Sequence, residues 1–108
     1  MPVIVEGKSD EEALRKLGVD DIVTLCGKPL YKVTQDISKR TEEILILTDY
    51  DREGRKLAKK LDNYFVSYGV LPNRKIRKKL GFIVNKTGIS HIEDITPNKI
   101  RDQISNIK

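Results

Sequence analysis

The stretch that decides the fold runs from Ile44 to Gly54 and reads Ile-Leu-Ile-Leu-Thr-Asp-Tyr-Asp-Arg-Glu-Gly. Its first four residues, Ile44–Leu47, are all apolar, without the alternation expected of a strand that has one face in water. They predict a central parallel strand that is covered on both faces. A long helix is expected after Asp51, ended by Gly69. Its apolar face is predicted to contain Leu57, Leu61, Tyr64, Phe65 and Tyr68.

Upstream of this stretch, two shorter apolar runs predict two further strands. Pro2–Val5 ends at Glu6-Gly7, and a helix is expected to follow it, capped by Ser9 with Glu12 in a capping box and ended at Gly18. The second run, Ile22–Leu25, turns at Cys26-Gly27 into a helix that has Pro29 as its first residue and continues to about Lys39.

Downstream, the pattern is less regular. Ile76, Leu80 and Ile83 predict a basic amphipathic helix within 72–87, interrupted at Gly81 and Phe82. The residues 88–92 fit a short strand or a loop, and Thr96-Pro97 starts a last helix with Ile100, Ile104 and Ile107 on its apolar face. Strands that alternate with helices indicate an α/β domain with a mostly parallel sheet and right-handed crossovers. With 108 residues, the chain is expected to form one domain over 1–108.

Composition narrows the classes of partner and compartment. The net charge is +5, which favours a polyanionic partner without identifying one. Cys26 is the only cysteine and His91 the only histidine, so an internal disulfide and a cysteine-based zinc site are both excluded. No apolar run approaches the roughly 20 residues of a membrane span, and no signal peptide is apparent. A cytoplasmic protein without membrane attachment is therefore expected.

Acidic residues follow two of the predicted strands. Glu6 ends the first strand, and Asp49 and Asp51 end the third. Ligands of open parallel sheets bind beyond the carboxyl ends of the strands, so these carboxylates converge if the two strands are neighbours. A divalent cation such as Mg²⁺, which prefers oxygen ligands and bridges to phosphate oxygens, would relieve their repulsion. The alternative is structural: Asp51 as a helix N-cap, Asp49 as a turn cap and Glu6 as a partner of Lys8.

Two segments of the chain resemble the motifs of the Toprim family. Residues 3–10, Val-Ile-Val-Glu-Gly-Lys-Ser-Asp, resemble its first motif, and residues 46–54, Ile-Leu-Thr-Asp-Tyr-Asp-Arg-Glu-Gly, resemble its second. Within the family, the chain looks most like small proteins related to the ribonuclease that matures 5S ribosomal RNA. Residues 88–95, Gly-Ile-Ser-His-Ile-Glu-Asp-Ile, add to that similarity. We expect no counterpart of the zinc ribbon and polymerase part of primases, of the DNA-gating domains of topoisomerases or of the RNA-binding extension of the 5S maturase.

The resemblance implies a Rossmann-like three-layer sandwich with helices on both faces of a central sheet. It implies that Asp49 and Asp51 coordinate Mg²⁺, for which Mn²⁺ can substitute, and that Glu6 is a general acid or base, or a third metal ligand. Glu53 is implied as an additional metal contact. Gly7 and Gly54 would let the backbone approach a phosphate.

Basic residues supply candidate phosphate contacts. Lys8 and Arg52 flank the acids and either hold a phosphate or neutralise the carboxylates. The densest basic run comprises Arg74, Lys75, Arg77, Lys78 and Lys79. It is either a non-specific nucleic-acid contact with salt-dependent affinity or a solvated helix face.

The remaining polar and aromatic candidates have more ordinary interpretations. His91 lies in a segment with Ile89 and Ile92, and packing or a satisfied hydrogen bond is favoured over proton transfer. Cys26 is expected to be a buried small residue. Tyr64, Phe65 and Tyr68 are expected in the core, and Tyr50 is the aromatic residue best placed to touch a substrate.

The leading hypothesis from sequence is a magnesium-dependent nuclease for structured RNA, with RNA favoured over DNA. A non-catalytic nucleic-acid-binding subunit of a larger complex is the alternative, and a regulatory domain that binds metal and nucleotide is a third hypothesis. A protein partner that supplies substrate specificity is compatible with each of them.

Overall fold

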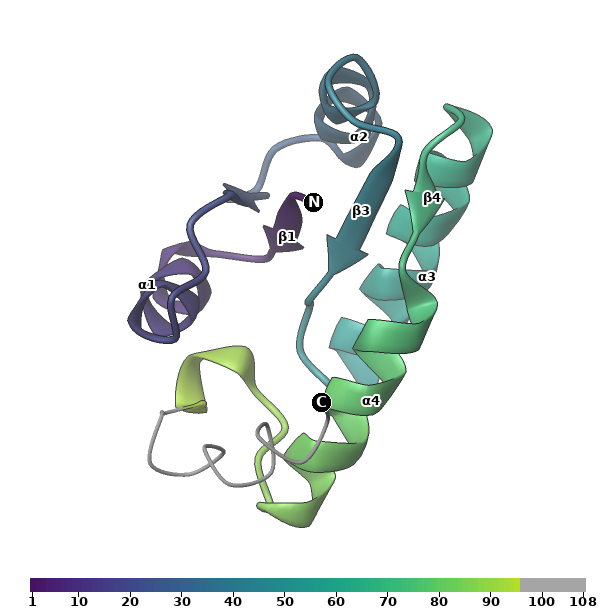
Figure 1. The fold of residues 1–108 in the computed structure, drawn as a ribbon. Coiled ribbons are helices and arrows are strands. Elements are labelled where there is room, and N and C mark those ends of the chain that lie inside the picture. The colour runs from purple at the N-terminus through teal and green to yellow at the C-terminus, as the bar shows by residue number, and fades with distance from the viewer. Residues whose placement is uncertain (96–108) are drawn as a thin grey trace.

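The computed structural model describes residues 1–95, and its centre is a sheet of four parallel strands (Figure 1). The strands stand in the order β2-β1-β3-β4. Their bounds are Val3–Val5 for β1, Ile22–Thr24 for β2, Glu43–Ile46 for β3 and Leu71–Pro72 for β4. This is the α/β sheet that the alternating pattern predicts.

The register places the first and third strands side by side. Val3 of β1 pairs with Leu45 of β3, and Ile4 pairs with Ile46. On its other side, β1 pairs with β2 from Val3↔Ile22 to Val5↔Thr24. Because β1 and β3 are parallel neighbours, the residues that follow them, Glu6 and Asp49, emerge at the same edge of the sheet.

Helices cover both faces of the sheet, as in a three-layer sandwich. On one face lie α1 (Lys8–Lys16), α4 (Arg74–Lys86) and the short 3₁₀ helix η1 (Ile92–Asp94), which packs against α1. On the other face, α2 (Leu30–Ser38) packs against α3 (Arg52–Ser67).

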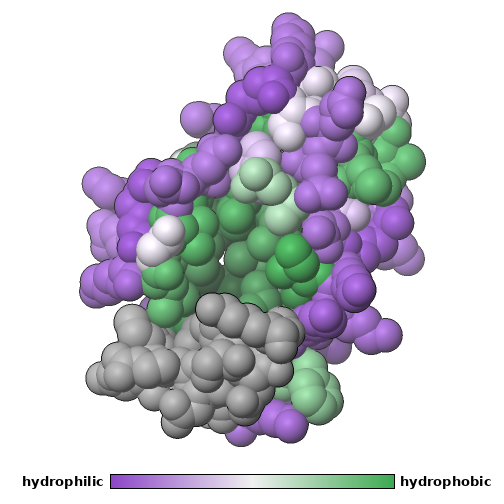
Figure 2. All heavy atoms as spheres, in the orientation of Figure 1, coloured by the Kyte–Doolittle hydropathy of each residue, from purple (hydrophilic) through white to green (hydrophobic). Residues whose placement is uncertain are grey.

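The central strands β1 and β3 and the residue after β3 supply side chains to both cores, because successive residues point to opposite faces. Val3, Val5, Leu45 and Leu47 pack with α1, α4 and η1. Ile4, Ile44 and Ile46 pack with α2 and α3. Full burial of one such side chain is worth about 1.5–3 kcal/mol. Figure 2 shows hydrophobic residues between α1 and α4, bordered by hydrophilic surface.

Two features of the downstream half differ from the sequence-based expectation. The two-residue strand β4 was not predicted; it pairs with β3 through Glu43↔Leu71 and Ile44↔Pro72. Helix α4 is continuous through Gly81 and Phe82. Gly81 is needed there because a Cβ atom would lie 2.7 Å from Cε1 of Tyr50. The predicted interruption of the helix at Gly81 and Phe82 is therefore wrong, because tertiary packing outweighs the low helix propensity of glycine.

Local predictions near the first helix also need correction. Gly7, not Ser9, is the N-cap of α1, and the Asp10 carboxylate accepts a 2.9 Å hydrogen bond from the Gly7 N–H. Pro29 precedes α2 as its N-cap and is not its first residue. Cys26 is exposed and has a positive φ of 46°, so it is not the buried residue expected.

The long helix α3 buries a narrower face than predicted. Gly54, Ala58, Leu61 and Phe65 are its buried residues, a spacing of four, three and four. Tyr64 and Tyr68 lie outside that stripe and are exposed, so their predicted core positions are wrong. The helix ends before Gly69, whose φ of 81° is the left-handed conformation expected of a terminating glycine.

The expected helix from Thr96 lies outside the described residues. Residues 88–91 form a loop rather than a strand and lead into η1. Within residues 1–95, every helix is too short or too polar to cross a lipid bilayer.

Candidate metal centre

A tight loop between β3 and α3 carries the two aspartates. Asp51 is the N-cap of α3, and its Oδ1 accepts a 2.7 Å hydrogen bond from the Gly54 N–H. The buried Thr48 closes the loop by donating from Oγ1 to the Gly54 carbonyl oxygen at 2.6 Å. A Cβ atom on Gly54 would lie 2.0 Å from the Asp49 carbonyl oxygen. Only glycine therefore lets the start of α3 approach the Asp49 backbone this closely.

Glu6 meets this loop from β1. Its Oε2 accepts a 3.0 Å hydrogen bond from the backbone N–H of Asp49. Burial raises the pKa of Glu6; the Asp49 N–H opposes this shift, and the negative charges of Asp49 and Asp10 add to it. The convergence of Glu6 with Asp49, which neighbouring strands predict, is thus present in the fold.

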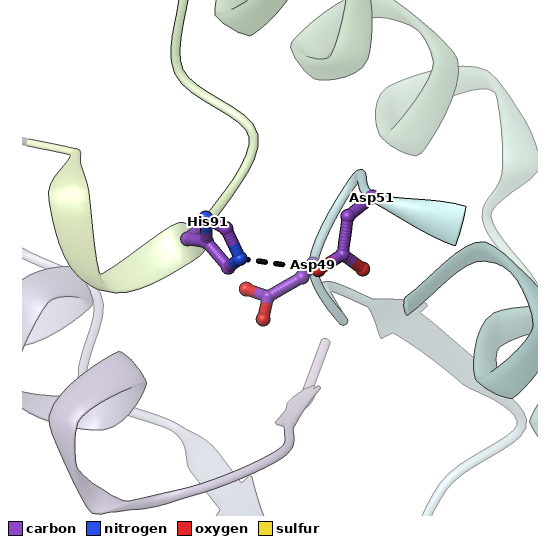
Figure 3. Close-up of side chains that lie close together, drawn as sticks. All are labelled: Asp49, Asp51 and His91. Atoms are coloured by element: carbon purple, nitrogen blue, oxygen red, sulfur yellow. Dashed lines mark ion pairs between the residues drawn. The ribbon is translucent and has the colours of Figure 1, made fainter. Parts of the chain in front are cut away.

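The third side chain of the centre is His91, which follows the loop from α4 (Figure 3). Its Nε2 lies 3.1 Å from Asp51 Oδ2. The imidazole is 45% exposed and faces the carboxylates of Asp49 and Asp51, so it is not packed in the core. The hydrogen-bonded role that the sequence also allowed agrees with its contacts. The sequence held no local signal for this contact, since forty residues separate His91 from Asp51.

Backbone hydrogen bonds fix His91 in place. The Tyr50 N–H donates to the Ser90 carbonyl oxygen at 2.7 Å, and the Ile92 N–H donates to Asp49 Oδ1 at 2.8 Å. The Ser90 hydroxyl lies 3.1 Å from His91 Nδ1. In the tautomer with its proton on Nδ1, the ring donates to this hydroxyl and presents the lone pair of Nε2 to the aspartates.

These three side chains fit a divalent cation. Asp49, Asp51 and His91 each offer a ligand atom, and the three atoms lie within 4.8 Å of one another. Opposite ligands of Mg²⁺ are about 4.2 Å apart, twice the usual Mg–O distance, so a small adjustment of the side chains suffices. Carboxylates suit Mg²⁺ and Mn²⁺, and an imidazole nitrogen strengthens the binding of Mn²⁺ more than that of Mg²⁺.

Asp10 is an acidic neighbour that the sequence argument did not identify. It is only 8% exposed. Burial raises its pKa; the Gly7 N–H opposes the shift, and the charges of Asp49 and Glu93 add to it. The clue available in the sequence was its position three residues after Gly7, where an acidic side chain can bond back to the N-cap amide.

Several predicted site residues lie elsewhere or have other contacts. The Glu53 side chain is 82% exposed and pairs with Lys56 at 3.7 Å, and it is not part of the metal-competent group. The Gly54 amide is occupied by Asp51, and the Gly7 amide by Asp10. Both amides therefore have hydrogen-bond partners within the protein, and the contact of these glycines with phosphate stays a prediction. Lys8 and Arg52 are exposed in the first turns of α1 and α3.

The basic run divides by helical position. Lys75 and Lys78 are exposed. Arg74 is also exposed but pairs with Asp62 through two hydrogen bonds of 2.8 Å, and this bonding raises the pKa of Arg74. Arg77 is half-buried, and its guanidinium donates to the carbonyl oxygens of residues 46, 48 and 49. Burial lowers the pKa of Arg77. Arg77 thus supports the loop that carries Asp49, a contact that a phosphate role did not predict.

Tyr50 makes contacts within the protein that the sequence did not predict. Its ring lies against Gly81, and its hydroxyl donates to the Arg77 carbonyl oxygen at 2.8 Å. Burial raises the pKa of Tyr50 to about 12. The residue between the two aspartates therefore anchors their loop to α4, with its hydroxyl hydrogen-bonded inside the protein.

Comparison with known proteins identifies relatives over most of the chain. The Toprim domain family matches residues 2–87. A UPF0292 protein of Methanocaldococcus jannaschii is 43% identical over 96 residues, which are 87% of this chain and 74% of that protein. A UPF0292 protein of Pyrococcus abyssi is 45% identical over 94 residues, covering 86% of this chain and 70% of its own length. A solved structure of an Aquifex aeolicus protein superposes with a TM-score of 0.75 at 30% identity, covering 87% of this chain and 83% of that chain.

Proposed function

This chain belongs to the Toprim domain family, whose domains bind divalent metal and act on nucleic acid, and we propose that it is a small magnesium-dependent nuclease that cleaves structured RNA. The observation that carries the proposal is the group formed by Asp49, Asp51 and His91 at the carboxyl edge of the sheet. Two carboxylates and an imidazole on short, hydrogen-bonded loops make a preorganised site for one divalent cation.

The proposal gives each residue a separate task. Asp49 and Asp51 hold Mg²⁺, or Mn²⁺ in its place, and His91 completes the protein's share of the ligands. A bound cation supplies positive charge to the phosphoryl oxygens of the cleaved bond. Lys8 and Arg52, exposed on the first turns of their helices, extend toward flanking phosphates.

Glu6 is proposed to move the proton, as general acid or base. The pKa of Glu6 is raised first by burial and then by the charges of Asp49 and Asp10. A raised pKa lies closer to neutral pH, where a carboxyl group can both accept and release a proton. The Asp49 N–H holds one of its oxygens in place. The alternative task for Glu6 is that of an additional metal ligand.

RNA is favoured over DNA because the segment that supplies His91 is the one that resembles the 5S-maturing ribonuclease. That segment, residues 88–95, is hydrogen-bonded to the aspartate loop at Tyr50 and Asp49. We also propose that, in the cell, a protein partner presents the RNA and supplies substrate specificity.

Metal binding is tested by calorimetric titration with Mn²⁺ and Mg²⁺ to millimolar concentration. Asp49→Asn and His91→Ala are expected to weaken Mn²⁺ binding at least about ten-fold. Glu53→Gln is the matched control. It also removes one negative charge near the site, but from an exposed side chain that is not one of the three proposed ligands. Equal Mn²⁺ affinity in all three variants and the wild type would contradict the site.

Catalysis is tested with a labelled RNA hairpin that carries single-stranded tails. Wild-type protein is expected to cleave it with Mg²⁺ and not with a chelator, and Asp51→Asn is expected to abolish cleavage. Salt-sensitive RNA binding without cleavage at any metal concentration would replace the nuclease with a non-catalytic nucleic-acid-binding subunit.

A further inference from the structure

A groove lies between α3 and α4, outside the metal centre. One hollow of about 530 Å³ has walls that include Arg55 from α3 and Lys78, Phe82 and Asn85 from α4. A second hollow of about 330 Å³ shares Arg74 and Arg77 with the first and continues along α3 past Lys59. Because they share these two arginines, the two hollows lie next to each other along the pair of helices, and together they are called the α3–α4 channel.

Most of the charged side chains that line the channel are positive. Arg55 and Lys59 stand on the α3 side, and Arg74 and Lys78 on the α4 side. Asp62 is the acidic residue of the lining, and Arg74 pairs with it at 2.8 Å. Of the other cations in the lining, Arg55, Lys59 and Lys78 are exposed at the surface, whereas Arg77 is half-buried. The exposed cations favour a polyanionic ligand.

An exposed aromatic ring stands in this cationic wall. Phe82 is 63% exposed, although it belongs to a helix whose neighbouring Ile83 and Val84 are buried. Lys86 Nζ lies 4.5 Å from the centroid of its ring. An aromatic platform beside cations is how proteins bind single-stranded nucleic acid, because unpaired bases stack on the ring while phosphates meet the charges. The bases of a duplex are already stacked on one another and do not offer their faces.

The channel ends at the loop of the metal centre. Tyr50, the residue between Asp49 and Asp51, forms part of its lining. From the same lining, Arg55 Nε donates to the Tyr50 carbonyl oxygen at 2.9 Å, and Arg77 donates to the Asp49 carbonyl oxygen at 3.2 Å. A strand that follows the channel therefore reaches Tyr50, in the loop that carries Asp49 and Asp51.

We propose that the α3–α4 channel binds a single-stranded segment of nucleic acid, with a base stacked on Phe82 and a phosphate on Lys78, and leads it to the Asp49–Asp51 loop. The proposal rests on the proposed nuclease function for what happens at that loop. Binding in the channel uses no metal ligand and is expected to persist with a chelator.

The experiment measures the anisotropy of short labelled single strands of RNA and DNA and of the matching duplexes, in chelator. The protein is expected to prefer single strands, and Phe82→Ala to weaken their binding about ten-fold while Phe82→Tyr restores it. Lys78→Ala should reduce the slope of log affinity against log salt by about 0.7, the value for one lost phosphate contact with a single strand. The controls are Tyr31→Ala and Lys32→Ala, which remove an exposed ring and an exposed cation from α2, outside the lining of both hollows.

Two results would overturn the channel: tighter binding of duplexes than of single strands, or an affinity for Phe82→Ala equal to that of Tyr31→Ala. The nuclease function fails separately. If Phe82→Ala loses binding but the wild type never cleaves, the channel stands and the nuclease does not. If the wild type cleaves and Phe82→Ala binds like the wild type, the nuclease stands and the channel does not.

Discussion

The Arg77 guanidinium lies 4.5 Å from the centroid of the Tyr50 ring, while the Tyr50 hydroxyl donates a 2.8 Å hydrogen bond to the Arg77 carbonyl oxygen. The two residues thus clasp each other through both side chain and backbone. Because the same guanidinium reaches the carbonyl oxygens of residues 46, 48 and 49, the clasp fixes the end of β3 against α4. The position of Asp49 in the metal centre therefore depends on a helix that contributes no ligand to it.

Replacing Arg77 with lysine keeps the charge but removes the planar fork, and one ammonium group does not reach three carbonyl oxygens with the same geometry. We expect the unfolding free energy in urea to fall by about 1–3 kcal/mol, the cost of leaving buried acceptors unsatisfied. Arg74→Lys is the matched control on the same helix; its exposed pair with Asp62 is worth at most about 1 kcal/mol. Equal stability of Arg77→Lys and Arg74→Lys would show that the clasp does not support the loop.

A methyl group at Gly54 is expected to disrupt the same loop from the other side. Its Cβ would lie 2.0 Å from the Asp49 carbonyl oxygen, which is backbone and cannot rotate away. We expect Gly54→Ala to lower the unfolding free energy by about 3 kcal/mol, at the upper end for over-packing and despite the better helix propensity of alanine.

The comparison for this substitution is Gly81→Ala, also within a helix. There the new methyl group meets the Tyr50 ring at 2.7 Å, and a side chain can shift. A smaller loss is therefore expected, and thermal unfolding of both variants measures the order. If Gly81→Ala were the more damaging of the two, the loop around Asp49 would be more adaptable than its contacts indicate.

Sequence patterns predicted the features that depend on local periodicity. The apolar run Ile44–Leu47 gave a central strand, and the acids after β1 and β3 converged because the strands are neighbours in the sheet. The helix-ending glycines at 18 and 69 have the positive φ expected of them. In each case the deciding interactions lie within a few residues or follow from the geometry of parallel strands.

The features that sequence patterns missed depend on contacts between distant segments. His91 approaches Asp51, which lies 40 positions earlier in the sequence, and Arg77 reaches Asp49, which lies 28 positions earlier. Neither contact has a periodic signature. Strand β4 has only two residues, too few for alternation to be visible. Tyr50 was predicted to face a substrate because its neighbours are acidic, yet the space beside Gly81 in α4 decides where its ring packs.

Asp10 is expected to make stability depend on pH. Its pKa is raised in the folded protein, first by burial, so the protonated carboxyl is the form that the fold favours. Its stabilising contribution is complete below the unfolded pKa of about 3.9 and is lost as the pH rises through the higher folded pKa. Asparagine keeps an oxygen for the Gly7 N–H and carries no charge. The difference in unfolding free energy between Asp10→Asn and the wild type should therefore shift in favour of the variant between pH 3 and pH 7.

Urea denaturation at both pH values measures that difference. Because the variant is compared with the wild type, the contributions of most other titrating groups to the unfolding free energy cancel. Glu12→Gln, an exposed position on the same helix, controls for the loss of one negative charge from α1. A difference that stays constant, or that moves in favour of the wild type as the pH rises, contradicts the raised pKa of Asp10.

Asp51 is both the helix N-cap and a member of the metal centre, the two roles that the sequence left open, because each of its carboxylate oxygens has its own contact. Oδ1 accepts from the Gly54 N–H as a helix cap, and Oδ2 lies 3.1 Å from His91 Nε2 in the metal centre. Asparagine caps helices about as well as aspartate, whereas alanine does not cap. We therefore expect Asp51→Asn to change the unfolding free energy by less than about 0.5 kcal/mol and Asp51→Ala to lower it by about 1 kcal/mol.

In Mn²⁺ titrations both variants should bind at least about ten-fold more weakly, because both lack the carboxylate. If Asp51→Asn kept wild-type Mn²⁺ affinity, or lost as much stability as Asp51→Ala, the division of labour between the two oxygens would be refuted.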